Sequence, residues 1–118
     1  MPLDPQVQQV LEQLDELGLP PNYMISPEEA RTNMMSKPRP DGPEVAKVED
    51  RTIANGDFQV PVRIYNPEGS GPFPVLIWFH GGGWVIGNLE TADEVARHLT
   101  VGAECVVVSV DYRLAPEA

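Results

Sequence analysis

The sequence of 118 residues is short of several things, and each shortage limits what the protein can be. It contains one cysteine, Cys105, so neither a disulfide within the chain nor a cysteine-rich zinc site is possible. Basic residues number 8 against 18 acidic ones, which gives a formal charge of −10. An acidic surface repels phosphate and anionic lipid, so we expect no nucleic-acid or membrane partner.

Long apolar runs are also absent. Pro, His or Gly interrupts each apolar stretch within a few residues, which excludes a membrane-spanning helix. Residues 1–10 carry neither a basic segment nor an apolar core, so we expect no secretory signal there. With the single cysteine, this favours a cytoplasmic location. Apolar residues make up 42% of the chain, which is enough for a folded globular domain.

The beginning of the chain is predicted to be helical and broken by prolines. Asp4 is a suitable helix cap, and apolar residues at 3.6 spacing predict a helix over residues 4–17. Ser26 and Glu29 have the spacing of a capping box, which predicts the start of a second helix. We therefore expect residues 1–43 to form an N-terminal helical cap region with its linker.

From residue 45 the pattern changes to that of strands, and we expect residues 44–118 to form the N-terminal part of an α/β core. Asn55-Gly56 is a strong hairpin signal between two alternating segments, the second over residues 58–65. Pro61 lies inside the second segment, which favours an edge position for that strand because proline cannot donate to a ladder.

The second half of the chain predicts a strand–helix–strand unit. Residues 74–79 are continuously apolar, typical of a strand that is buried on both faces, and residues 105–110, apolar except for Ser109, predict a second buried strand. Residues 90–101 between them have helical spacing, and Gly102 is expected to end that helix. Such a unit has parallel strands, so the fold class is α/β. We expect residues 106–110 to be central in a complete sheet but to present an unpaired apolar edge in this chain alone, with poor solubility.

Three consecutive glycines directly follow the first of these strands, in the loop from His80 to Gly87. Glycine permits positive φ and leaves no Cβ in the way of a ligand. Successive backbone N–H groups can then point into one concavity and bind an anion. In acyl transfer that anion is the oxygen of the tetrahedral intermediate, where one donor contributes about 3 kcal/mol in the transition state.

Two motifs together resemble a known family. His80 to Trp84, HGGGW, resembles the HGGG-type oxyanion loop of α/β-hydrolase esterases. Residues 111–117, DYRLAPE, resemble the second signature of the hormone-sensitive-lipase-like group, also called bacterial esterase family IV. The resemblance covers roughly residues 40–118, and it implies the N-terminal portion of an α/β-hydrolase carboxylesterase. In that group the second motif is mainly structural, so an ion pair or turn contacts are expected of Asp111 and Arg113.

The resemblance also implies a role for each residue of the first motif. Gly82 and Gly83 would donate their backbone N–H groups to the oxyanion. Gly81 would allow the turn, and the His80 side chain would position the loop through hydrogen bonds. Trp84 would line the acyl or alcohol pocket. The substrate would be a small ester, no metal or organic cofactor would be needed, and the complete enzyme could be a homodimer.

The catalytic triad of such an enzyme is not in this chain. No Gly-x-Ser-x-Gly occurs, and the four serines are Ser26, Ser36, Ser70 and Ser109. Ser109 lies inside a predicted strand rather than at a strand-to-helix turn. The nucleophile, acid and base are expected after residue 118, so the chain carries part of an oxyanion hole and should be inactive alone.

Two alternatives stay open at this point. A dinucleotide-binding unit also has a strand, a glycine-rich loop, a helix and a strand, with Asp111 where a ribose-binding acid would lie. The spacing argues against it, because the third glycine of the fingerprint would fall at Ile86 and comes one residue later, at Gly87. The other alternative is an inactive truncated or split product that needs a partner chain.

Overall fold

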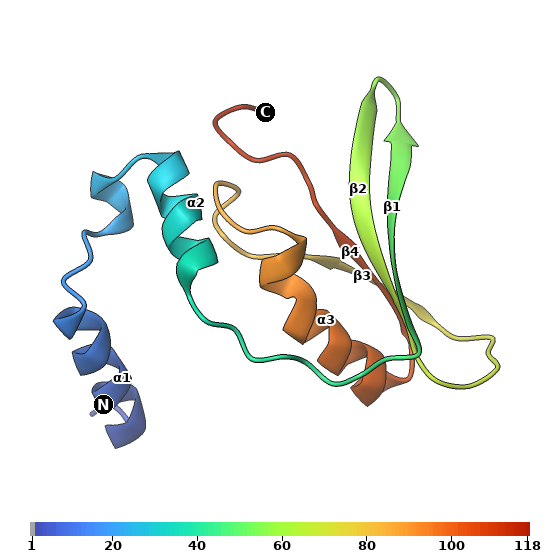
Figure 1. Cartoon of the computed structure of the whole chain (residues 1–118), viewed down its shortest axis with the longest axis horizontal. Coiled ribbons are helices and arrows are strands. Elements are labelled where there is room, and N and C mark those ends of the chain that lie inside the picture. The colour runs from blue at the N-terminus through green and yellow to red at the C-terminus, as the bar shows by residue number, and fades with distance from the viewer. Residues whose placement is uncertain (1) are drawn as a thin grey trace.

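A four-stranded mixed sheet forms the centre of the computed structural model, which describes residues 2–118 (Figure 1). Its strands follow the order β1-β2-β4-β3 and are β1 (Lys47–Asn55), β2 (Phe58–Asn66), β3 (Val75–Phe79) and β4 (Val106–Val110). β1 pairs with β2 and β2 with β4 in antiparallel fashion, whereas β3 and β4 are parallel. The predicted strand–helix–strand unit and its parallel pairing are confirmed.

The predicted hairpin joins β1 and β2 through a two-residue turn. Asn55 pairs with Phe58, so the turn residues are Gly56 and Asp57. Gly56 has a φ of 61°, a left-handed value that glycine adopts without steric cost. The hairpin signal of the sequence is therefore confirmed.

The edge position expected for β2 from Pro61 is wrong. β2 lies between β1 and β4, but the β4 ladder covers only Val62 to Tyr65. The carbonyl of Pro61 accepts from Asp111, just beyond the end of β4. In a strand, the N–H and C=O of one residue point to the same side, so the proline nitrogen faces a position where no ladder bond is needed.

Helix α3 (Leu89–Ala103) covers one face of the sheet through small side chains. Its buried residues are Ala92, Ala96 and Thr100, which let the helix approach the strands closely. The helix does not end at Gly102 as expected. It continues to Ala103, and Glu104 takes the left-handed conformation at its C-terminus, with a φ of 47°; β4 then begins at Val106, opposite Val75.

The core lies between α3 and the sheet. Tyr65, Ala96, Cys105 and Val107 are buried together there. The Tyr65 hydroxyl donates to Asp93 at 2.7 Å, which satisfies a polar group that burial would otherwise leave unpaired. Desolvation, reinforced by the Asp93 carboxylate, raises the pKa of Tyr65. The core thus holds the middle of the sheet while the loops at the strand ends stay open.

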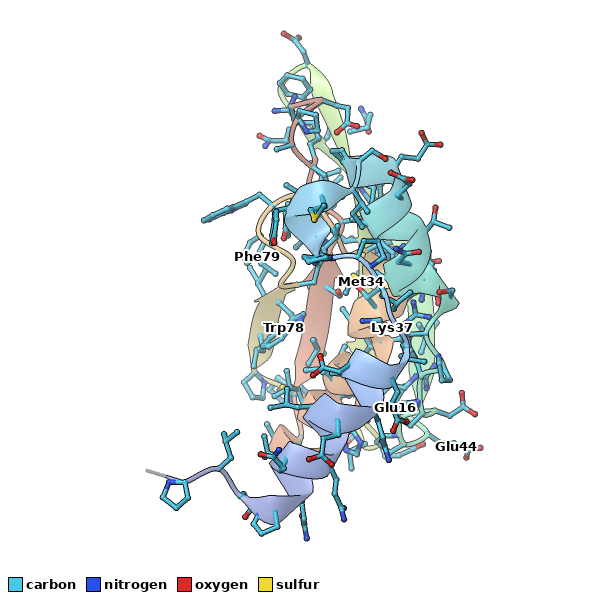
Figure 2. The ribbon with its side chains drawn as sticks, turned by 90° about the vertical axis from the view of Figure 1, so that its left-hand side faces the viewer. Glu16, Met34, Lys37, Glu44, Trp78 and Phe79 are labelled. Atoms are coloured by element: carbon cyan, nitrogen blue, oxygen red, sulfur yellow. The ribbon has the colours of Figure 1, made fainter. Side chains whose placement is uncertain are left out.

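Strands β1 and β3 are the two edges of the sheet, and the expectation that the 106–110 strand presents an unpaired edge in this chain is wrong. β4 has a neighbour on each side, since β2 returns to pair with it. Val75, Ile77 and Phe79 on β3 are 64%, 60% and 62% exposed, whereas Trp78 packs against the core. Trp78 and Phe79, both labelled in Figure 2, are neighbours in sequence and lie on opposite faces of the strand. The prediction that this strand is buried on both faces is therefore wrong for this chain.

The N-terminal helices lie to one side of the sheet (Figure 1). They are α1 (Pro5–Glu16), the short 3-10 helix η1 (Asn22–Met24) and α2 (Pro27–Ser36). The predicted Asp4 cap and the Ser26 capping box are both present. The apolar stripe of α1 is exposed along its whole length, so packing within this chain does not explain it. None of the helices in the described chain has the length and apolar character of a membrane span.

We expect this chain to associate when expressed alone, through the bare β3 edge. A lysine on an exposed edge opposes strand addition, so Ile77→Lys should lower the association seen by light scattering and size-exclusion chromatography. Val101 is also exposed but lies on α3, so Val101→Lys is the matched control and should change little. A monodisperse wild-type chain with a sharp thermal transition would contradict this prediction.

Candidate functional site

The two sequence motifs meet because β3 and β4 are parallel and end together. Phe79, the last residue of β3, pairs with Val110, the last residue of β4. The loops over residues 80–87 and 111–117 therefore leave the sheet side by side at its carboxyl edge, which is where ligands of open α/β sheets bind.

The glycine loop is a tight turn closed on the carbonyl of Gly82. That oxygen accepts from the N–H groups of Val85 and Ile86, both at 3.1 Å. The φ of Gly82 is 133°, and a Cβ there would overlap the Ile86 carbonyl. Only glycine fits this position, and the reason is the close approach of the Ile86 backbone within the turn itself.

The other two glycines have open space around them. Gly83 has a φ of 59°, which also favours glycine, whereas Gly81 does not use left-handed backbone. Of the three consecutive glycines, Gly82 and Gly83 have left-handed backbone and Gly81 does not. Neither the Gly82 nor the Gly83 N–H has a hydrogen-bond acceptor within residues 2–118.

Both of these glycines border open hollows. A hollow of about 360 Å³ is lined by Phe79, His80, Gly81, Gly82, Gly83, Trp84 and Tyr112. A second one, of about 320 Å³, lies between the turn and the N-terminal helical region, where Tyr23, Ile25, Pro27 and Ala30 line it. Gly82 and Gly83 line both hollows, and the second hollow is bounded by both parts of the chain.

His80 is buried and fixed on both of its sides. Its Nδ1 lies 2.9 Å from the carbonyl oxygen of Gly81, so the Nδ1–H tautomer donates there. The ring stacks on Tyr112 at 4.4 Å between centroids, and the Tyr112 hydroxyl donates to the His80 carbonyl at 2.6 Å. A Cβ on Gly87 would overlap Nδ1, so that glycine makes room for the ring. His80 Nε2 has no hydrogen-bond partner within the described chain.

Trp84 has a left-handed backbone, with a φ of 60°, which is unfavourable for a residue that is not glycine. Its carbonyl accepts from the Ala115 N–H at 2.7 Å, so the second motif holds this conformation. The indole is 75% exposed and lies at the hollow beside the glycines. Strain of this kind persists where surrounding contacts enforce it, often at functional sites.

Arg31 on α2 is the site residue that the sequence analysis missed. Its Nε donates to the Val85 carbonyl at 2.8 Å, and Nη2 donates to the Ala115 carbonyl at 2.9 Å. Its two terminal nitrogens bind the Glu117 carboxylate at 2.9 and 2.8 Å. One guanidinium therefore joins the N-terminal helical region to both motifs. Its one sequence signal is that it is the first basic residue of the chain, after six acidic ones.

An ion pair or turn contacts are expected of Asp111 and Arg113 from the sequence, and the ion pair is not formed within residues 2–118. The Arg113 guanidinium lies 3.7 Å from the ring centroid of Phe58, at the hairpin turn, so it makes a cation–π contact instead. Asp111 forms no ion pair within residues 2–118, and burial raises the pKa of its carboxyl, an effect that His80 and Arg63 oppose. The hairpin thus reaches the second motif through Phe58, which sequence spacing does not reveal.

Metal ligands are not gathered in this part of the chain. The described residues bring no three His, Cys, Asp or Glu side chains into a group that could hold a metal ion. The polar groups at the site are backbone N–H groups, one buried imidazole and one guanidinium held by a carboxylate. Such an arrangement suits the binding of a small anion or a developing oxyanion.

Comparison with known proteins gives one consistent family. The sequence profile of the α/β-hydrolase fold matches residues 76–118. Over 120 residues the chain is 37% identical to an arylesterase of Saccharolobus solfataricus, covering 99% of this chain and 39% of that protein. Over 90 residues it is 47% identical to the carboxylesterase NlhH of Mycobacterium tuberculosis, covering 75% of this chain and 28% of that one.

Solved structures agree with this. An ester hydrolase from the metagenome of Lake Arreo, solved with a derivative of bipyridine phosphonate, matches with a TM-score of 0.87 and 36% identity. A hyperthermophilic esterase from the archaeon Pyrobaculum calidifontis matches with a TM-score of 0.79, also at 36% identity. The chain is covered to 98% and 100% in the two cases but spans 39% of each relative.

We expect the contact between Arg31 and Glu117 to depend on pH. Hydrogen bonds from the guanidinium lower the pKa of Glu117 from 4.5 to about 2. A carboxyl whose pKa is lower in the folded state stabilises the fold above its unfolded pKa, and that stability is lost as the pH falls towards 2. Glu117→Gln should therefore lower the denaturation midpoint of the complete protein at pH 7, and the difference should vanish near pH 2.

The control for this titration is the exposed Glu104, which forms no ion pair in the part of the chain that the structure describes. Glu104→Gln should leave the denaturation midpoint at pH 7 unchanged. A deficit of Glu117→Gln that stays constant from pH 7 to pH 2 would contradict the assignment.

Proposed function

The chain has the α/β-hydrolase fold, and from this premise we propose that the complete protein hydrolyses carboxylic esters. The observation that carries the proposal is that Gly82 and Gly83 line an open hollow while their N–H groups have no acceptor within residues 2–118. Relatives that span this whole chain are named arylesterase and esterase, which supports the same chemistry.

The proposed mechanism is nucleophilic acyl transfer. A serine supplied by the chain after residue 118 attacks the ester carbonyl carbon, and a histidine takes the serine proton while an acidic residue orients that histidine. The carbonyl oxygen becomes an oxyanion, which the Gly82 and Gly83 N–H groups bind. The alcohol leaves with a proton from the histidine, and water then hydrolyses the acyl-enzyme.

The other side chains of the loop have supporting roles in this proposal. His80 fixes the Gly81 carbonyl, and Trp84 lines the pocket for the acyl or alcohol group. Residues 1–43 form a cap region over a core that begins at residue 44, supported by the hollow that both parts line. The substrate is a small ester, and the unpaired Cys105 favours a cytoplasmic location. A homodimer of the complete protein stays a prediction.

The dinucleotide-binding alternative is not favoured. The named relatives are ester hydrolases, and Gly87 serves here to make room for the His80 ring.

Gly82→Pro in the complete protein tests the proposal. Proline removes one N–H donor and cannot adopt the φ of 133°, so kcat for p-nitrophenyl esters should fall by at least about 10²-fold, with a much smaller change in KM. Gly102→Ala is the matched control, because Gly102 lies in α3 with open space around it. Unchanged turnover in Gly82→Pro would refute the oxyanion assignment.

The chain of residues 1–118 should show no esterase activity above a buffer blank, because it holds no serine at a strand-to-helix turn. Labelling with a fluorophosphonate, which reacts with activated serines, is the direct measurement. The complete protein should be labelled and this chain should not. Labelling of the chain at any of its four serines would contradict the proposal.

A further inference from the structure

Each N–H of the glycine turn shares a rigid plane with the carbonyl of the preceding residue. In a trans peptide these two groups point in opposite directions, so whatever holds the carbonyl also aims the N–H. Within the described residues, cis peptides occur only before Pro72 and Pro116, so the peptides of this turn are trans. The Gly81 carbonyl therefore sets the direction of the Gly82 N–H, and the Gly82 carbonyl sets that of Gly83.

The two carbonyls are held from different directions. That of Gly81 accepts from the His80 ring in the same loop. That of Gly82 accepts from the N–H groups of Val85 and Ile86 across the turn. The Ile86 N–H belongs to the peptide whose carbonyl is that of Val85, and that carbonyl accepts from Arg31 Nε at 2.8 Å. Two peptide units in series thus connect the guanidinium to the Gly83 N–H.

The guanidinium at the start of this series is itself fixed. Four hydrogen bonds hold it, one to Val85, one to Ala115 and two to the Glu117 carboxylate. The planar fork of arginine can satisfy these three directions at once, whereas the ammonium of lysine is a point charge without a fixed fork. Because Arg31 belongs to α2, the contact also holds that helix against the turn.

The series also has a direction. A cationic donor on the Val85 carbonyl withdraws electron density from that peptide and strengthens the hydrogen bond that the Ile86 N–H donates to Gly82. That bond in turn polarises the peptide between Gly82 and Gly83, which makes the Gly83 N–H a better donor. The effect therefore acts towards the atom that would meet a developing negative charge.

We propose that Arg31 is a positioning residue for ester hydrolysis, which aims and polarises the Gly83 N–H through the Val85–Ile86 and Gly82–Gly83 peptides. This inference rests on the proposed function, since it assigns a purpose to the donor at Gly83. By this proposal the N-terminal helical region covers the site and also orients the Gly83 N–H.

A simpler view, in which Arg31 is only a clamp on Glu117, makes different predictions. Glu117 touches the guanidinium but not the turn, so Glu117→Gln leaves the bond from Arg31 to Val85 available. Arg31→Gln removes both the charge and that bond. Arg31→Lys keeps the charge but loses the fork. The series through Val85 predicts that kcat falls most in Arg31→Gln, less in Arg31→Lys and least in Glu117→Gln.

The experiment compares these variants in the complete protein, with Arg39→Gln as the matched control. Arg39 is an exposed arginine that, within residues 2–118, binds two carbonyls and one sulfur at the end of α2. We expect Arg31→Gln to lower kcat by about 10- to 100-fold with KM changed much less, because misplacement of a donor acts on the transition state. Hydrogen exchange of the Ile86 N–H should also accelerate in Arg31→Gln, while Arg39→Gln leaves both readouts unchanged.

Equal losses of kcat in Glu117→Gln and Arg31→Gln would overturn the proposal in favour of the clamp, as would unchanged exchange at Ile86 in Arg31→Gln. If Arg31→Gln does not fold, Arg31→Lys decides by the same two readouts. Absence of esterase activity in the complete wild-type protein would contradict the proposed function. The exchange readout would still show whether Arg31 holds the turn.

Discussion

Parallel pairing of β3 with β4 is the constraint on which the rest of the structure depends. Phe79 and Val110 end their strands side by side, so the loops that follow must share one edge of the sheet. The glycine turn and the DYRLAPE segment then meet through short contacts, such as that of the Tyr112 hydroxyl with the His80 carbonyl. Without this register the two motifs would still be present in the chain, but neither could fix the conformation of the other.

The glycine turn shows how a backbone site is built from rigid units. The N–H groups of Gly82 and Gly83 have no acceptor within residues 2–118, and their direction is set by the peptide planes to which they belong. One plane is fixed by the His80 ring inside the loop, and the next is fixed from outside by α2 through Arg31. The site is thus shared between segments separated by more than fifty residues.

Two apolar surfaces of this chain are exposed within the described residues. One face of β3 is bare, and α1 carries an exposed apolar stripe. The chain spans 39% of the length of relatives such as the arylesterase. The apolar run of β3 predicts a strand but does not show whether one face or both are covered. That depends on neighbouring elements, which the run itself does not identify.

The sequence by itself determined the local elements and the candidate site. Caps at Asp4 and Ser26, the Asn55-Gly56 hairpin and the strand–helix–strand unit depend on residues close together in the chain, where propensity and spacing decide. Only the tertiary structure decided the order of the strands, which makes β2 internal despite Pro61, and the contacts of Arg31 and of Arg113 with Phe58. The reason is physical: these pairings join residues about forty to ninety positions apart, and the folded sheet, not any local preference, brings them within hydrogen-bonding or stacking distance.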